Sequence, residues 1–246
     1  PRVSPAKTVE GSIGGLVASI AAAVASKYIF FPELPVPDAV ALQKRMHDQL
    51  VLAPPAGFAP RLIAGADISL SRGSDVAYAG IVVIDRETMA TVDEATSASR
   101  VAFPYVPGLL SFRELPALEP VWAALGTRPD VLVFDGAGYA HPRRFGLACH
   151  GGVLFGLPSI GCAKSILVGT HEPLGPERGA RAPLVHKGEV VGTAIRLKAN
   201  VAPVFVSPGH LMDVDTAVEV VLAMSAGYRE PETTRRAHRL VNEKRR

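Results

Sequence analysis

Cysteine is nearly absent from this sequence, and the two that occur, Cys149 and Cys162, are not spaced as a C-x-x-C pair. They provide neither a zinc site nor a disulfide framework, and such sparing use fits a reducing compartment. Internal repeats are absent, and residues 38–246 contain no apolar run long enough to cross a membrane. These absences argue against a zinc module and against a membrane enzyme with several spans.

The length of 246 residues, 48% of them hydrophobic, suits one large domain or one domain with an appendage. A net charge of +3 and a pI near 9.0 are compatible with nucleic-acid binding but are not evidence for it. Residues 229–246 carry six Arg and one Lys against three Glu. This C-terminal segment is the strongest candidate for a cationic surface, and a solvated terminal helix is the alternative.

The N-terminal part differs in composition from the rest. Residues Ser12–Phe31 carry a single charge, on Lys27, and have the length of a membrane span. The stretch SPAKTVEGSIGG (Ser4–Gly15) resembles a signature beside a membrane helix in phosphatidate cytidylyltransferases, but the rest of that enzyme's catalytic set is missing. We interpret residues 1–37 as an apolar appendage and linker, and residues 38–246 as the functional domain. A membrane tether through residues 12–31 and a buried or loosely attached helix are both open.

The remaining chain alternates between strand-like and helix-like segments. Apolar runs that end in turn residues predict strands, and amphipathic stretches between breakers predict helices. The predicted strands are Leu62–Leu70, Val76–Ile84, Thr91–Phe103, Asp130–Gly136, SIGCAKS (159–165), Glu189–Leu197 and Pro203–Val206. The predicted helices are Asp38–Leu52, Glu114–Leu125, Pro142–Gly151, Asp213–Ser225 and Arg235–Lys244, and SRGSD (71–75) is a predicted hairpin turn. This order favours an α/β fold in which helices flank a mixed β-sheet.

Two aspartates occur in predicted strands that are otherwise apolar. Asp67 lies within LIAGADISL, and Asp135 ends DVLVFDG. Burying an unpaired carboxylate is costly, so neighbouring positions for the two would favour a divalent cation between them. Oxygen ligands without a cysteine pair indicate Mg²⁺ or Mn²⁺, an arrangement used for phosphodiester hydrolysis. The alternative is that Asp67 pairs with Arg61 or Arg143 and that Asp135 belongs to a turn.

The stretch FPYVPGLLSFRE (Phe103–Glu114) combines two prolines with several large apolar residues and ends in a carboxylate. Two prolines do not fit a buried strand, because each removes a ladder donor. A surface loop that exposes Tyr105, Leu109 and Leu110 together indicates a binding function. We interpret the stretch as a stiff apolar loop that leads to Glu114.

Six stretches of the sequence resemble the endonuclease V family, whose members act on deaminated adenine in DNA. They are AGADISL, FPYVPGLLSFRE, FDGAGYAHPRRFGLACH, IGCAKSILVG, PVFVSPGHLMDVDTA and YREPETTRRAH, in the family's order from about residue 38 onward. The resemblance implies a ribonuclease H-like fold and an Mg²⁺-dependent endonuclease that accepts Mn²⁺ as a substitute. It also implies nicking at the second phosphodiester bond 3′ to deoxyinosine, with 5′-phosphate products, and action of some members on inosine in RNA.

The resemblance also implies roles for individual residues. It implies metal binding by Asp67 and Asp135, and catalysis by Asp67, Glu114, Asp135, Lys164 and His238. It implies DNA contacts from Tyr105, Val106, Pro107, Gly108, Leu110, Gly136, Gly138 and His141, with Tyr105–Gly108 as a wedge that enters the duplex where the modified base is displaced. Ala137 departs from the polar residue that is frequent in the family, which would alter the base pocket. Thr233 replaces a proline of the usual PEPTR, which would loosen the placement of His238.

Functions from three classes compete. The leading interpretation is a cytoplasmic, monomeric endonuclease for inosine-containing DNA or RNA. A catalytically silent lesion binder is the second, although the complete acidic set argues against it. A membrane-tethered lipid enzyme is the third, and the absence of further apolar spans argues against it. On the ordinary alternatives, Lys164 is a strand-end cation, His141 and His150 are satisfied helix histidines, His210 is a turn histidine, and both cysteines are core residues.

Overall fold

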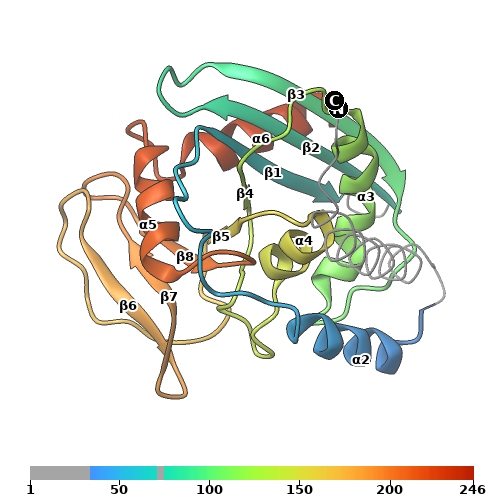
Figure 1. Ribbon diagram of the computed structural model, residues 1–246, viewed down its shortest axis with the longest axis horizontal. Helices are drawn as coiled ribbons and strands as arrows, with labels where there is room; N and C mark the ends of the chain where they lie inside the picture. The colour runs from blue at the N-terminus through green and yellow to red at the C-terminus, as the bar shows by residue number, and fades with distance from the viewer. Residues whose placement is uncertain (1–33, 71–74) are drawn as a thin grey trace, which may run out of the picture.

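One eight-stranded sheet, with the strand order β3-β2-β1-β4-β5-β8-β7-β6, organises the protein (Figure 1). The computed structural model describes residues 34–70 and 75–246. The strands are β1 Leu62–Leu70, β2 Val76–Asp85, β3 Thr91–Arg100, β4 Val131–Phe134, β5 Ser159–Ala163, β6 Arg181–His186, β7 Glu189–Ile195 and β8 Val204–Pro208. The described helices are α2 Val36–His47, α3 Leu110–Ala124, α4 Leu147–Phe155, α5 Val214–Ala223 and α6 Glu232–Arg245. The predicted membrane-length segment and residues 71–74 of the predicted turn lie outside the described residues.

The strand directions make the sheet mixed. Strands β1, β2 and β3 form an antiparallel meander, and β4 and β5 run parallel to β1. Strands β8, β7 and β6 then continue the sheet with antiparallel pairs. The predicted α/β fold with a mixed sheet is therefore confirmed.

Alternate residues of the central strands face two separate hydrophobic layers. Ile63, Val131 and Val133 pack with α5 and α6, whereas Leu132 and Phe134 pack with α3 and α4. This is the period-2 alternation of a strand, here with both faces buried, and it explains why β4 is an uninterrupted apolar run. Helix α2 lies outside these layers, beside α4 and at the opposite end of the molecule from β3 (Figure 1).

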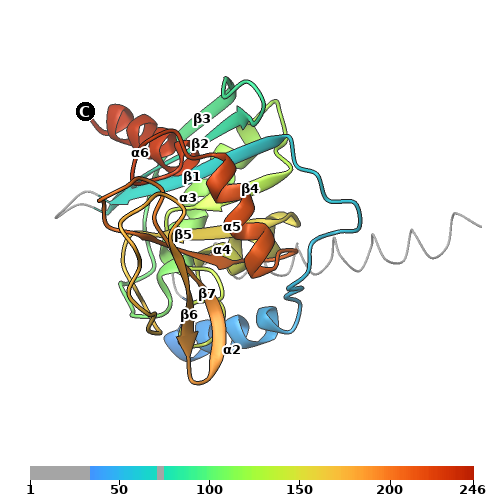
Figure 2. The ribbon, with the colours of Figure 1, turned by 90° about the vertical axis from the view of Figure 1, so that its left-hand side faces the viewer.

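Helix α6 packs unusually close to β1 and β2 (Figure 2). A Cβ atom on Gly65 would lie 2.0 Å from the Thr233 carbonyl oxygen, and one on Gly80 would lie 2.8 Å from Val241 Cγ2. Only glycine at these two strand positions leaves room for the helix. The carboxylate of Glu232 fixes the first turn through ion pairs to Arg235 and Arg236. Thr233 is fully buried in this turn, so α6 is anchored there without the family's proline.

Several predicted boundaries were wrong, for identifiable reasons. Helix α4 begins at Leu147 and not at Pro142, because Arg144 adopts φ 56°, which a right-handed helix cannot contain. Helix α3 begins four residues before Glu114, at Leu110, so the apolar loop is shorter than expected. Helix α2 begins at Val36, so the proposed boundary between residues 37 and 38 falls inside it.

The remaining differences lie at the ends of elements or in one missed strand. The third predicted strand ends at Arg100 and not at Phe103, α2 ends at His47 and not at Leu52, and α6 begins at Glu232 and not at Arg235. Strand β6 was not predicted, because Pro183 interrupts its pattern. The strand tolerates this proline because it is the edge of the sheet.

Candidate active site

The register between β1 and β4 brings Asp67 and Asp135 together. Ala66 is paired with Phe134, and the Asp135 backbone N–H donates to the Ala66 carbonyl at 3.2 Å. Each aspartate therefore follows a member of the last parallel pair, at the carboxyl end of β4. His238 reaches the same place from α6, and the three side chains offer ligand atoms that all lie within 4.8 Å of one another.

The contacts around Asp67 differ from the predicted arginine alternative. His238 Nδ1 lies 2.9 Å from Asp67 Oδ2, and His238 Nε2 lies 2.9 Å from the Asn242 side-chain nitrogen. These contacts fit the tautomer in which Nδ1–H donates to Asp67 and Nε2 accepts from Asn242. Arg61 instead forms an ion pair with Asp85 at 2.8 Å, and Arg143 donates to Gly108, so neither arginine neutralises Asp67. Burial, and then the charge of Asp135, raise the pKa of Asp67.

Glu114 is the third acid of the group. It lies in the second turn of α3 and is only 9% exposed. Burial raises its pKa to about 8, with further contributions from the charges of Asp67 and Asp135. The predicted acids from three separate elements are thus electrostatically coupled in one place.

Lys164 lies directly after β5 and contacts two carboxylates. Its Nζ donates to Asp135 Oδ2 at 2.7 Å and lies 3.1 Å from Glu230 Oε2. Partial burial acts to lower the pKa of Lys164, but the contacts with Asp135 and Glu230 outweigh it and raise the pKa. Glu230 had no predicted role, although it stands in the YREPETTRRAH stretch. The sequence carries no signal that would pair it with a lysine 66 residues earlier.

The donor set suits a divalent cation. Two carboxylates and an imidazole can bind Mg²⁺ or Mn²⁺, and a third acid stands close by. A single lysine does not balance three neighbouring carboxyl groups, whose mutual repulsion is visible in the raised pKa values of Asp67 and Glu114. The acidic cluster (Asp67, Asp135 and His238, with Glu114 beside it) therefore has the chemistry of a metal site.

A cavity of about 150 Å³ brings most of the predicted DNA-contact residues together. This volume is on the order of that of an apolar cavity which binds one benzene ring. The cavity, called the base pocket below, is lined by Tyr105, Val106, Pro107, Gly108, Leu110, Ser111, Gly136, Ala137, His141, Gly146, Leu147 and Leu167. Gly136 adjoins Asp135, so the pocket opens beside the acidic cluster. Ala137 is a pocket residue, which makes this departure from the family part of the lining.

Three apolar side chains at the pocket are exposed to solvent. They are Tyr105 at 71%, Leu167 at 55% and Leu110 at 37% exposure. Exposed apolar groups around a cavity are typical of a binding site. Leu167 and Ser111 had no predicted role. The apolar ILV that follows Lys164 in a turn is the signal that could have indicated Leu167.

Gly138 is not among the pocket residues. A Cβ there would lie 2.3 Å from the Pro208 carbonyl oxygen, and its N–H donates to Ser207 Oγ at 2.8 Å. Glycine at this position allows the loop after β4 to pack against β8.

Two polar side chains hold the wedge loop, residues Tyr105–Gly108. The Gly108 carbonyl accepts hydrogen bonds from Gln43 Nε2 at 3.1 Å and from Arg143 Nη2 at 2.5 Å. Gly108 has φ 80°, a left-handed conformation that favours glycine. Burial and the adjacent Arg143 lower the pKa of His141 to about 4, so the ring lines the pocket in its neutral form. Gln43 and Arg143 had no predicted role here.

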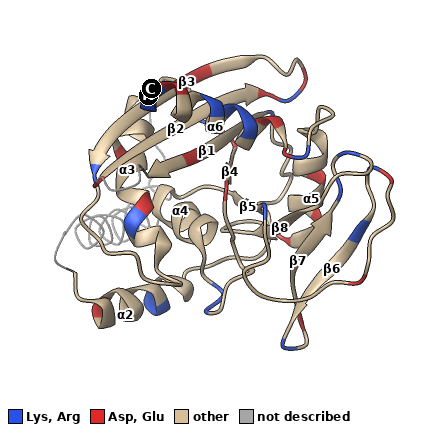
Figure 3. Ribbon diagram, turned by 180° about the vertical axis from the view of Figure 1, so that it is seen from behind, with Lys and Arg blue, Asp and Glu red and all other residues tan. Residues whose placement is uncertain are grey.

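The other candidates from the sequence have ordinary surroundings. Cys149, Cys162 and His150 are buried in the core, and Val51 N–H donates to His210 Nδ1 at 3.3 Å. Figure 3 shows Lys and Arg residues along α6. Two of these arginines are paired with Glu232, so part of the C-terminal positive charge is neutralised within the helix.

A mixed sheet whose central parallel strands lead into clustered acids is the architecture of a metal-dependent nuclease with a ribonuclease H-like fold. The family model described as endonuclease V matches residues 44–239, which is more than half of the chain. This protein belongs to the endonuclease V family, and it is an endonuclease. Endonuclease V of Myxococcus xanthus is 62% identical over 209 residues, which cover 85% of this chain and 89% of that protein.

Solved structures support the same assignment. Endonuclease V from Streptomyces avermitilis has a TM-score of 0.81 and 44% identity, with coverage of 85% of this chain and 92% of that one. Endonuclease V from Ciona intestinalis, in complex with a 23mer DNA that contains an inosine followed by a ribo-adenosine, has a TM-score of 0.72 and 25% identity, with coverage of 85% and 96%. Within residues 34–70 and 75–246, no helix has the length and apolarity needed to cross a membrane.

Proposed function

We propose that this endonuclease nicks DNA at the second phosphodiester bond 3′ to deoxyinosine and requires Mg²⁺, for which Mn²⁺ can substitute. The observation that carries the proposal is the position of the acidic cluster directly beside the base pocket, since Asp135 adjoins the pocket residue Gly136. A relative of known structure binds inosine-containing DNA, which supports the choice of substrate.

Each residue of the acidic cluster has a distinct proposed role. Asp67 and Asp135 would hold the divalent ion, with His238 as a further ligand or as the group that orients Asp67. When bound, the ion supplies Lewis-acid chemistry for phosphodiester hydrolysis. Glu114, with its raised pKa, is suited to exchange a proton with the attacking water near neutral pH.

Lys164 would contact the scissile phosphate. Its ammonium group already binds Asp135 at 2.7 Å, so a phosphate held at the acidic cluster lies within its reach. A cation in this place stabilises the negative charge that develops during phosphoryl transfer. The contact with Glu230 keeps the side chain extended toward the cluster.

The base pocket would receive the displaced hypoxanthine. Its volume of about 150 Å³ suits a single flat ring system, and its apolar lining favours stacking. Tyr105, on the stiff Tyr105–Gly108 wedge, would fill the gap that the displaced base leaves in the duplex. The neutral ring of His141 provides a hydrogen-bonding group at the wall of the pocket.

The test is cleavage of a duplex with one deoxyinosine by the wild type and by Asp135→Asn, with and without Mg²⁺. We expect Asp135→Asn to abolish nicking and to retain binding, because contacts to the phosphates and the base lie elsewhere. Asp215→Asn, an exposed aspartate in the first turn of α5, is the matched control and should cleave normally.

Full cleavage by Asp135→Asn would refute the metal assignment. Binding of inosine duplex without cleavage by the wild type at any Mg²⁺ or Mn²⁺ concentration would instead support the silent lesion binder. An RNA duplex with one inosine, run in parallel, tests whether the same site accepts RNA.

A further inference from the structure

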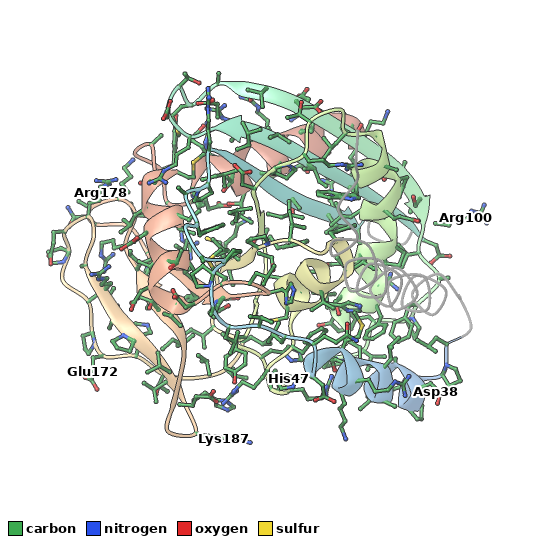
Figure 4. All side chains as sticks on the ribbon, in the orientation of Figure 1. Asp38, His47, Arg100, Glu172, Arg178 and Lys187 are labelled. Carbon is green, nitrogen blue, oxygen red and sulfur yellow. The ribbon has the colours of Figure 1, made fainter. Side chains whose placement is uncertain are left out.

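The hairpin formed by β6 and β7 contacts two different walls of the base pocket. Its tip carries Lys187 and Gly188, both in left-handed conformations with φ 57° and 79°. Figure 4 labels Lys187 at the outer end of this hairpin. Neither β6 nor β7 carries a residue of the acidic cluster or of the pocket lining, so the role of the hairpin must be indirect.

The first contact joins the hairpin to the loop between β4 and α4. Glu189, the first residue of β7, accepts hydrogen bonds from Tyr139 Oη at 2.7 Å and from Arg144 Nε at 2.8 Å. These bonds, that from Tyr139 first, lower the pKa of Glu189, so its carboxylate is anionic at neutral pH. Tyr139, Ala140 and two hairpin residues, Leu184 and Val191, also form a small hydrophobic cluster.

Arg144 transmits this contact to the wall of the pocket. Its Nη1 donates to the carbonyl of the pocket residue His141 at 3.1 Å, and its Nη2 donates to the His186 carbonyl at 3.1 Å. Arg144 adopts φ 56°, which costs free energy for a residue other than glycine. Such a conformation persists where surrounding contacts enforce it, and the contacts with Glu189 and His186 are of that kind.

The second contact joins the hairpin to the segment after β5. Thr170 and Val185 form an antiparallel bridge, with N–H to carbonyl distances of 2.9 and 2.8 Å. A Cβ on the intervening Gly169 would lie 3.0 Å from the Val185 carbonyl oxygen, so the two segments are in close contact. The bridged segment contains the pocket residue Leu167 and begins at Lys164. The hairpin is therefore a frame that spans the His141 wall and the Leu167 wall.

We propose that Glu189 is a positioning residue for base recognition, which acts through Arg144 and Tyr139 to set the separation of the two pocket walls. The inference rests on the proposed function, because it assigns the pocket to the displaced base. The carboxylate fixes one wall to the hairpin, and the Thr170–Val185 bridge fixes the other. Loss of the carboxylate would free the Arg144 turn and widen the pocket, without a change at the acidic cluster.

The test compares Glu189→Ala and Glu189→Gln on duplexes that contain one deoxyinosine or one deoxyuridine. For Glu189→Ala we expect KM for the inosine duplex to rise by about tenfold, on the scale of one lost charge-assisted hydrogen bond. We expect kcat to stay within about twofold of the wild type, and the preference for inosine over uracil to fall. Glu189→Gln keeps an acceptor for Tyr139 and should restore part of the preference.

Two further variants complete the experiment. Glu172→Ala removes an exposed carboxylate from the segment outside the hairpin (Figure 4) and should behave as the wild type. Tyr139→Phe removes only the Oη contact and should shift KM in the same direction by a smaller factor, which keeps the test valid if Glu189→Ala does not fold.

Three outcomes would overturn the proposal: unchanged KM and base preference in a folded Glu189→Ala, a loss confined to kcat, or no effect of Tyr139→Phe when Glu189→Ala is unfolded. Failure of the proposed function looks different, because the wild type itself would then show no preference for inosine over unmodified DNA.

Discussion

The backbone of Thr233 lies where a side chain on Gly65 would have to stand: a Cβ there would be 2.0 Å from the Thr233 carbonyl oxygen. This contact sets the distance between β1 and α6, and thereby the distance between Asp67 and His238. Both partners of the 2.9 Å contact in the acidic cluster thus depend on a residue that carries no functional group.

Gly65→Ala should therefore lower both stability and activity. The added methyl group meets backbone and not a flexible side chain, so α6 must shift, at a cost of about 1–3 kcal/mol in the free energy of unfolding. Nicking should fall beyond the loss that unfolding explains, because His238 moves with the helix. Denaturant unfolding and single-turnover cleavage measure the two effects. Gly126→Ala, where the nearest atom to the new Cβ lies at 3.7 Å, is the matched control.

Tyr105→Ala tests the wedge. The side chain is 71% exposed and its truncation should leave the fold intact. Binding to an inosine duplex should weaken by about 1–3 kcal/mol, the scale of one lost base–aromatic stack, and binding to single strands should weaken less. Tyr105→Phe keeps the ring and should bind almost as the wild type does. Equal duplex affinity for Tyr105→Ala and the wild type would mean that the loop serves packing alone.

Glu114 predicts a pH dependence for the metal-free protein. Its folded pKa of about 8 lies above the ordinary value of 4.5, so the folded state binds more protons between these pH values. Stability should therefore fall as pH rises through this window. Buried neutral histidines, His141 and His150, oppose the trend at lower pH, because their pKa values are lowered to about 4 and about 3. The decline should thus be clearest between about pH 6.5 and 8.

Glu114→Gln should flatten that decline and make the metal-free protein more stable at about pH 8. Thermal unfolding in the presence of a chelator, followed by titration with Mg²⁺, is the measurement. An identical pH profile for the wild type and Glu114→Gln would show that Glu114 is not the group responsible.

Removal of the N-terminal residues tests the proposed domain boundary. Leu34 packs against the cluster beneath the wedge loop, and Pro35 is the N-cap of α2. A chain that starts at Leu34 should fold and nick inosine DNA at the full-length rate. A chain that starts at Asp38 lacks the first residues of α2 and should lose about 1–3 kcal/mol of stability, as expected when a packed leucine is removed. Loss of folding on removal of residues 1–33 would show that they belong to the core, and sedimentation of the full chain with lipid vesicles would support a tether.

The sequence predicted the elements whose pattern is local. The β1–β2–β3 meander and the apolar β4 follow from strand periodicity and turn residues, so this part of the sheet could be expected from the residues alone. The start of α4 could not, because the left-handed Arg144 is held by contacts from a hairpin about 45 residues away. Strand β6 alternates buried Ala182 and Leu184 with more exposed neighbours, but Pro183 obscures a pattern that only an edge position explains.

The candidate site divides in the same way. Asp67 and Asp135 could be identified because a lone acid in an apolar strand is conspicuous, and the family resemblance supplied Glu114, Lys164 and His238. Residues that act through others carry no such signal: Gln43 and Arg143 support the wedge loop from two distant elements, and Glu230 meets Lys164 only in the folded chain.

The last helix also determines when the enzyme can first act. His238 meets Asp67 across 171 positions of sequence, and the segment that supplies it begins at Glu232, after every strand of the sheet. Ribosomal synthesis proceeds from the N-terminus, so a nascent chain can pair β1 with β4 long before α6 exists. Until then the strand face at Gly65 and Gly80 has no cover, and the acids lack their histidine. An interrupted translation product that ends before Glu232 is therefore expected to be inert toward nucleic acid, so incomplete chains pose no risk of unselective cutting.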